Sequence, residues 1–266
     1  MNTAASIESG LESQAVLSAL TTLLTAYLIL VAPLVGRYKY RKFQQKLAAG
    51  YPNARIHAYK KMLVRYAALI TAVLLVALLG PISPEMLGLT APRSWIESAR
   101  ILGILLGATA VSILIFRYRG EWQFRQLQRM AGAMLPISAP EQLWFAAVGI
   151  GASISEELLY RGFLLWYFLT FFPRLDWWED IAICSIAFGL AHLYQGWRGV
   201  AGSAALGFCF GLLYLGTGSL IVPMVVHAAV DLRILAVISQ ERRHRLAKAW
   251  PAPTAPPTTQ SARADN

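Results

Sequence analysis

Residues 141–171 read EQLWFAAVGIGASISEELLYRGFLLWYFLTF, an almost unbroken apolar stretch with two adjacent glutamates near its middle. A helix needs about 20 predominantly apolar residues to cross the hydrocarbon core of a bilayer. The stretch is therefore long enough to cross a membrane, and its surplus length predicts a tilt or an extension past the bilayer. Glu156 and Glu157 then lie where lipid disfavours a charge, so the stretch predicts both a membrane fold and an unusual site within it.

The composition of the chain also indicates lipid as its solvent. Of the 266 residues, 56% are hydrophobic and only 14% are charged, against roughly 25% charged residues in a soluble domain. We predict an all-α fold, a polytopic transmembrane helix bundle of about seven spans. Besides 141–171, the candidate spans are 15–36, 62–80, 98–117, 180–195, 200–216 and 220–239.

The basic residues predict how the bundle is oriented. The net charge of +10 is concentrated in three segments, 37–61, 117–129 and 242–248. With seven crossings, all three segments fall on one side of the membrane. Basic loops stay in the cytoplasm, so we predict an external N-terminus and a cytoplasmic C-terminus. This placement explains the positive charge better than nucleic-acid binding does.

The later spans contain ionisable residues that a bilayer disfavours. A charge at the bilayer centre costs several kcal/mol, so such residues usually face the interior of a bundle and mark function. They occur on the fourth, fifth and seventh spans only, which predicts one shared catalytic or transport cavity. Its candidate residues are Glu156, Glu157, Arg161, His192, His227 and Asp231.

The spacing of these residues suggests different tasks for the two glutamates. Neighbouring residues of a helix point about 100° apart, so Glu156 and Glu157 are not expected to face one centre. Glu157 and Arg161 have the i, i+4 spacing of a helical ion pair. We therefore assign this pair a structural role, which leaves Glu156 as the candidate general base.

Two kinds of chemistry fit the set. In one, Glu156 and His192 activate a water that attacks a carbonyl, while His227 and Asp231 lie beside the developing oxyanion. In the other, His192, His227 and Glu156 bind zinc. No HExxH supports a zinc peptidase helix, and no GxSxG supports a serine nucleophile.

Three short motifs resemble those of a known family. SEELLYRGFLL contains EExxxR at 156–161, FGLAH gives FxxxH at 188–192, and HAAVD gives Hxxx(N/D) at 227–231. In this order they are similar to the motifs of the CPBP family of intramembrane proteases. That family includes type II CAAX prenyl endopeptidases and bacterial bacteriocin-processing and self-immunity proteins. The resemblance covers about 95–235.

The resemblance implies an intramembrane endopeptidase whose site opens to the cytoplasm and cuts a membrane-associated protein or peptide. It implies an integral, multi-pass protein of the bacterial inner membrane. It also divides the chain into three parts. An N-terminal region, 1–94, carries two spans and a basic cytoplasmic loop, 95–240 forms the protease core, and 241–266 forms a Pro-, Ala- and Thr-rich tail predicted to be disordered.

One residue departs from the pattern of the family. Asp231 stands where the prenyl-protein enzymes carry Asn. An Asn amide donates to an oxyanion, whereas an ionised Asp repels it. Asp231 is therefore protonated, orients His227 or binds a metal, and the departure favours zinc and disfavours prenylated substrates.

Two other functions are compatible with buried acids in a bundle. One is a non-catalytic membrane protein that sequesters a peptide, as an immunity protein of the same fold would. The other is a proton-coupled transporter, for which two related halves with broken helices are expected. The chain shows no internal repeat, so the transporter is the weaker hypothesis.

Overall fold

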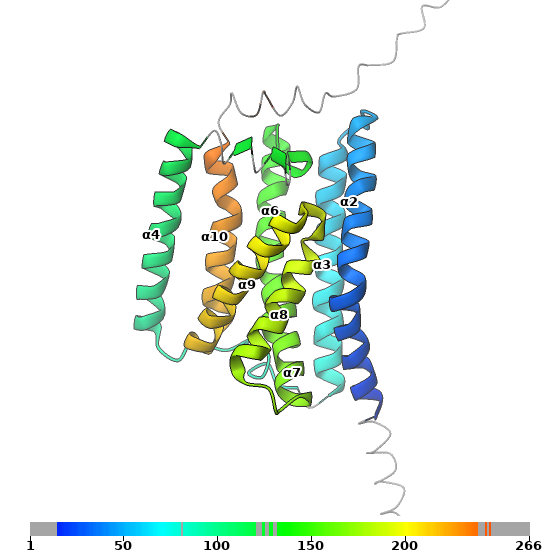
Figure 1. Cartoon of the computed structure of the whole chain (residues 1–266), viewed down its shortest axis with the longest axis vertical. Coiled ribbons are helices and arrows are strands. Elements are labelled where there is room, and N and C mark those ends of the chain that lie inside the picture. Colours follow the sequence, from blue (N-terminus) through cyan, green and yellow to red (C-terminus); the bar gives the residue numbers. More distant parts are fainter. Residues whose placement is uncertain are drawn as a thin grey trace, which may run out of the picture.

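The computed structural model describes residues 15–80, 82–120, 124–125, 128–129, 132–238, 243 and 245. Throughout these ranges the chain is helical or in turns, with no strand, which confirms the all-α prediction (Figure 1). The predicted disordered tail, 241–266, lies outside the described residues apart from positions 243 and 245.

In the described residues, each of the seven predicted stretches is mostly helical. The first helix, Ala15–Ala48, includes a π-helical turn, Tyr27–Val31, and continues as α2, Ala32–Ala48. It is followed by α3 (Ala54–Leu79), α4 (Trp95–Arg119), α6 (Ala139–Glu157), a π-helical segment (Leu158–Leu164), α7 (Leu165–Phe171), α8 (Trp177–Ala191), α9 (Trp197–Thr217) and α10 (Ile221–Val237). Short 3-10 turns occupy Gly132–Met134 and Leu193–Gln195.

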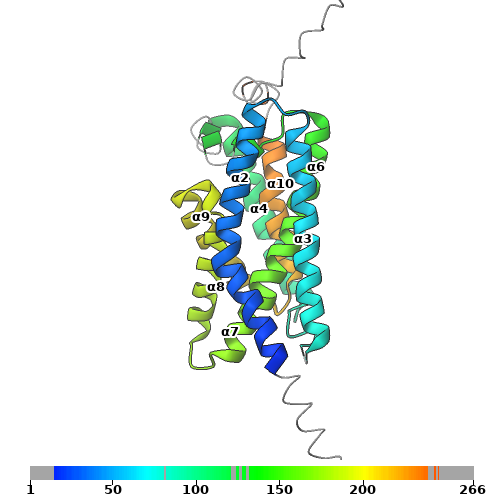
Figure 2. The same cartoon turned by 90° about the vertical axis from the view of Figure 1, so that its right-hand side faces the viewer.

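Four of the described helices are long and apolar enough to cross a membrane: Ala15–Ala48, Ala54–Leu79, Trp95–Tyr118 and Trp197–Thr217. The fourth, fifth and seventh predicted spans do not meet these criteria, because the fourth carries several glutamates and the helices of the other two, α8 and α10, are shorter. All three run alongside the long helices (Figures 1 and 2). The chain runs alternately up and down, so the start of the first helix and the end of α10 lie at opposite ends of the bundle. The protein is a helical membrane bundle.

The prediction that residues 37–61 form a loop is wrong. The first helix continues past residue 36 to Ala48, and α3 already begins at Ala54, so only a short turn separates them. The predicted helix ends were placed where the apolar residues end, at residues 36 and 62. The backbone instead stays helical beyond the lipid because Phe43, Leu47 and Ala54 pack with Ala133 in a small core at this end.

The π-helical segment Leu158–Leu164 lies at the centre of the main core. All seven of its residues are buried, and the core around it draws residues from distant helices, including Leu28, Ile181 and Leu220. A Cβ on Gly162 would lie 2.9 Å from the carbonyl oxygen of Leu87, so the glycine permits this close approach. Such insertions in a helix often mark functional sites, and this one follows Glu157 directly.

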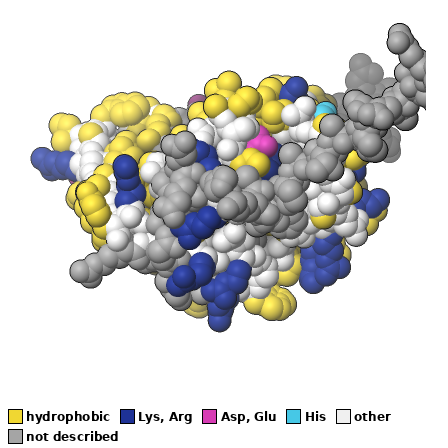
Figure 3. All heavy atoms as spheres, turned by 90° about the horizontal axis from the view of Figure 1, so that it is seen from above, with side chains coloured by type: hydrophobic (Ala, Val, Ile, Leu, Met, Phe, Trp, Pro, Cys, Tyr) yellow, Lys and Arg dark blue, Asp and Glu magenta, His cyan; other side chains and the backbone are white. Residues whose placement is uncertain are grey.

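The two ends of the bundle differ in charge. The end of α2, the start of α3 and the end of α4 all lie at the upper end of the bundle in Figure 1, and Figure 3 shows Lys and Arg side chains around that end. The described acidic residues of the opposite end include Glu85, Glu97, Asp176 and Glu179. By the positive-inside rule, the basic end is the predicted cytoplasmic one.

The orientation is tested with two single-cysteine variants in which Cys184 and Cys209 are replaced by Ala. A cysteine at Glu85 lies at the acidic end and one at Ala49 at the basic end. We expect a membrane-impermeant thiol reagent to label Glu85→Cys in intact cells and Ala49→Cys only after permeabilisation. The reverse pattern would invert the predicted topology.

A pair of glycines tests the packing of α8 on α9. A Cβ on Gly189 would lie 2.6 Å from the carbonyl oxygen of Val200, whereas a Cβ on Gly202 would meet nothing within 4 Å. We expect Gly189→Ala to lower the free energy of unfolding by about 1–3 kcal/mol through overpacking. Gly202→Ala is the matched control and should be neutral or slightly stabilising. Thermal unfolding in detergent micelles measures both, and equal effects would contradict the close contact.

Candidate active site

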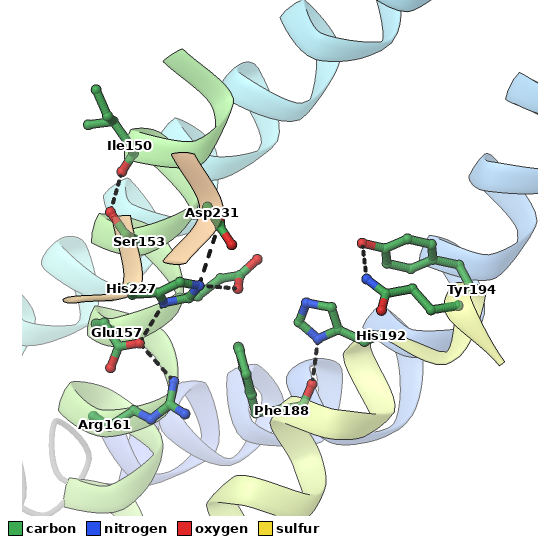
Figure 4. Close-up of polar contacts among 11 residues, drawn as sticks. Ile150, Ser153, Glu157, Arg161, Phe188, His192, Tyr194, His227 and Asp231 are labelled. Atoms are coloured by element: carbon green, nitrogen blue, oxygen red, sulfur yellow. Dashed lines mark hydrogen bonds and ion pairs between the residues drawn. The ribbon is translucent and has the colours of Figure 1, made fainter. Parts of the chain in front are cut away.

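The most buried charge in the core is the carboxylate of Glu157, whose side chain is 0% exposed. It lies on the last residue of α6, where its Oε1 accepts a hydrogen bond from Nη1 of Arg161 over 3.1 Å. The same oxygen accepts one from Nδ1 of His227 on α10 over 2.8 Å (Figure 4). The i, i+4 ion pair expected from the spacing is therefore formed, and it also holds a histidine from a distant helix.

Aromatic rings cover the cationic side of this cluster. The guanidinium of Arg161 lies 4.4 Å from the ring centroid of Phe188 and 5.4 Å from that of Phe210. Phe210 also stacks on the imidazole of His227, with centroids 5.0 Å apart. The electron-rich ring faces attract the cation and exclude lipid and water from it. The ion pair is thereby held in a dry environment.

His227 lies between two further carboxylates. Its Nε2 is 3.9 Å from Oε2 of Glu156 and 3.8 Å from Oδ2 of Asp231. Glu156 and Glu157 therefore face the same imidazole, contrary to the expectation from the 100° helical step. The expectation failed because an imidazole presents its two nitrogens on different edges, so two diverging carboxylates can flank one ring.

The hydrogen bonds indicate where the protons of His227 lie. Oε1 of Glu157 already accepts from Arg161, and as an acceptor it pairs with Nδ1 of His227 as the donor. The opposite nitrogen, Nε2, faces two carboxylates. If Nε2 and both carboxylates were all unprotonated, their lone pairs would face and repel one another. A proton is therefore favoured on Nε2 or on one of these carboxyl groups.

His192 caps the end of α8 and approaches from the other side. Its Nδ1 lies 2.9 Å from the carbonyl oxygen of Phe188. A carbonyl only accepts, so Nδ1 carries the hydrogen and Nε2 keeps a free lone pair. In Figure 4 the His192 ring points toward the space that His227 and Asp231 also line. In the FxxxH motif, the backbone carbonyl of the phenylalanine thus orients the histidine four residues later.

Glu156 and His192, which are predicted to activate one water together, are not in direct contact. Among the described residues, no hydrogen bond or ion pair joins His192 to another candidate residue, and its Nδ1 partner is Phe188. The ring of Phe188 lies 4.8 Å from that of His192 and 6.0 Å from that of His227. A water or a substrate group would have to connect Glu156 and His192.

The zinc alternative, with His192, His227 and Glu156 as ligands, stays a prediction. In the part of the chain that the structure describes, no group of three or more His, Cys, Asp or Glu side chains is placed to hold a metal ion. Zinc needs its ligands within about 2.0–2.2 Å of one centre.

Two residues next to His192 were missed by sequence reasoning. Tyr194 and Gln195 form the 3-10 turn after α8, and Nε2 of Gln195 donates to the hydroxyl of Tyr194 over 3.0 Å. The Tyr194 ring packs on that of Tyr40 at 5.0 Å, and Figure 4 shows the Tyr194 hydroxyl turned toward the His192 side of the site. Their position directly after FxxxH is the signal that could have found them.

These features define a class of protein: a polytopic helical membrane protein with carboxylates and histidines gathered at one buried site. Comparison with protein families agrees with the motifs. Residues 138–233 match the family model described as type II CAAX prenyl endopeptidase Rce1-like, which is the kind of family that the motifs resemble. The matched range begins at the N-cap of α6 and includes all six candidate residues. Comparisons with curated proteins and with solved structures gave no match.

The shared carboxylate generates a stability prediction. Glu157→Ala leaves Arg161 and His227 buried without their common acceptor, and removing one partner of a buried ion pair costs about 3–5 kcal/mol. We expect a lower thermal unfolding temperature in micelles and a lower yield. Glu156→Gln is the control, because the Glu156 side chain is partly exposed and its contact with His227, at 3.9 Å, is longer than a hydrogen bond. Wild-type stability of Glu157→Ala would contradict the central role of this carboxylate.

Proposed function

We propose that the protein is an intramembrane endopeptidase of the bacterial inner membrane, which cuts a membrane-associated protein or peptide at a cytoplasm-facing site. The observation that carries the proposal is the grouping of Glu156, His192, His227 and Asp231 around one space within a segment that matches the model of a protease family. Carboxylate and imidazole groups are the usual acid–base catalysts of hydrolysis.

The exposure of the site supports access from the basic end. Side-chain exposure is 0% for Glu157, 7% for His227, 16% for Glu156 and 35% for Asp231. Asp231 lies one turn beyond His227 on α10, which runs toward the basic end. Exposure therefore rises in that direction, so a substrate would enter from the predicted cytoplasmic side.

The first chemical step is the attack of water on a peptide carbonyl. Glu156 accepts a proton from the water while the water oxygen forms a bond to the carbonyl carbon. The free Nε2 of His192 orients this water by accepting its second hydrogen. The electron pair of the C=O double bond moves to the carbonyl oxygen, which becomes an oxyanion.

The second step is the collapse of the tetrahedral intermediate. His227 is held by Glu157 through Nδ1, so a proton on its Nε2 is directed at the oxyanion and stabilises it. The C–N bond then breaks, and the amine leaves with the proton that Glu156 took from water. Asp231 accepts from the Nε2–H of His227 and so orients it. An ionised Asp suits this role, whereas an Asn would donate directly to the oxyanion.

The general-base assignment is tested with Glu156→Gln, which keeps the shape of the side chain but cannot accept a proton from water. We expect cleavage to fall by at least about 100-fold while the protein stays folded, since a positioned acid–base group contributes typically 10²–10⁴-fold. The assay uses purified protein in proteoliposomes and two matched quenched fluorescent CAAX peptides, one prenylated on its cysteine and one not. Wild-type cleavage by the variant would remove Glu156 from the role of base.

The same preparation separates the alternatives. The metal-free mechanism predicts that a zinc chelator leaves cleavage unchanged, whereas loss of cleavage and its recovery with added zinc would favour the metal mechanism. If neither peptide is cut, membrane peptides of cells carrying the wild type and Glu156→Gln are compared. A phenotype that the variant supports as well as the wild type would favour the non-catalytic peptide-binding protein.

A further inference from the structure

The helix ends that replace the predicted basic loop form an exposed patch of positive charge. Six exposed cations of α2 and α3 lie next to the apolar parts of these helices, and the segment 37–61 contains no acidic residue. We call this set the α2–α3 basic patch. It comprises Arg37, Lys39, Arg41, Lys42, Lys60 and Lys61.

The patch lies at the level of the lipid headgroups. At 1.5 Å per residue, the apolar stretch 15–36 covers about 33 Å, close to the roughly 30 Å of a bilayer core. Arg37 to Lys42 follow this stretch within two helical turns. On α3, Lys60 and Lys61 stand immediately before the apolar stretch that begins at 62. Both helices thus place their cations just outside the hydrocarbon.

Aromatic residues mark the same level. Lys42 lies over the ring of Tyr38, with the ammonium 4.8 Å from the centroid, and Lys60 lies over that of Trp144 on α6 at the same distance. Tyr and Trp concentrate at membrane interfaces, and the side chain of Tyr38 is well exposed. An ammonium over a ring keeps N–H donors for an anion.

The described part of the chain supplies no anion to the patch. None of its six cations forms an ion pair with a described residue, and Glu141 on the adjacent α6 is engaged by the buried Arg55 at 3.7 Å. Two other arginines donate to backbone carbonyls instead. Arg129 donates to the carbonyl of Arg125, and Arg243 donates to that of Ile238.

We propose that the α2–α3 basic patch binds the phosphate headgroups of anionic phospholipids. Phosphate supplies the missing negative charge at the depth where the cations lie, and juxtamembrane basic clusters are attracted to anionic lipid. The contact between Tyr40 on α2 and Tyr194, beside His192, joins the same helix to the active site. Headgroup binding would hold α2 in that contact.

The experiment titrates the full chain in neutral detergent micelles with phosphatidylglycerol or phosphatidylcholine. Native mass spectrometry counts bound lipid, and thermal unfolding follows stabilisation. We expect phosphatidylglycerol to bind and stabilise, phosphatidylcholine not to, and the difference to shrink in high salt. The triple variant Lys42→Gln, Lys60→Gln, Lys61→Gln should lose roughly tenfold or more in apparent affinity for phosphatidylglycerol. Replacing the same three lysines with Arg should retain it.

The matched control removes the same charge elsewhere at this end: Arg117→Gln, Arg125→Gln, Arg129→Gln. It should change the apparent affinity less than about twofold if the patch is the binding site. Equal loss in both glutamine variants would overturn the proposal in favour of net charge alone. Equal binding of the two lipids would overturn it as well, and so would an acidic peptide that displaces phosphatidylglycerol at similar concentration. None of these readouts depends on peptidase activity.

Discussion

Burying a carboxylate in a membrane bundle is unfavourable unless charges and donors surround it, and the Glu157 carboxylate meets that condition through four helical elements. It accepts from Arg161 on the π-helical segment and from His227 on α10, while Phe188 of α8 and Phe210 of α9 cover the cation and the imidazole. The carboxylate, the guanidinium and the imidazole are each costly to bury alone. Together they tie the later helices to one point and determine the orientation of His227.

The polarity of the site follows from that arrangement. With Nδ1 of His227 committed to the buried side, Nε2 faces Glu156 and Asp231 on the more accessible side. Exposure increases from Glu157 to Asp231 along the direction in which α10 runs. The buried ion pair of Glu157 and Arg161 thus positions a more exposed set of groups, and the structural charge is separate from the groups available for proton transfer.

Much of the fold could be predicted because lipid constrains composition and length. The apolar stretches identified each helix, and the fourth ended at Phe171 as predicted. The helix ends near 37–61 could not be predicted, since they depend on Phe43, Leu47 and Ala54 meeting Ala133 from a distant part of the chain. The hydropathy of a segment reports where lipid ends, whereas helix length beyond lipid depends on packing.

For the site, the sequence by itself determined the residue types, the i, i+4 pair of Glu157 with Arg161 and the FxxxH spacing, because these relations lie within a single helix. Only the tertiary structure decided that Glu156 and Glu157 flank one imidazole, that Phe210 stacks on it, and that Tyr194 joins the His192 side. The reason is physical. Helical periodicity gives directions along one helix, but which nitrogen of His227 meets which carboxylate depends on how α10 packs against α6.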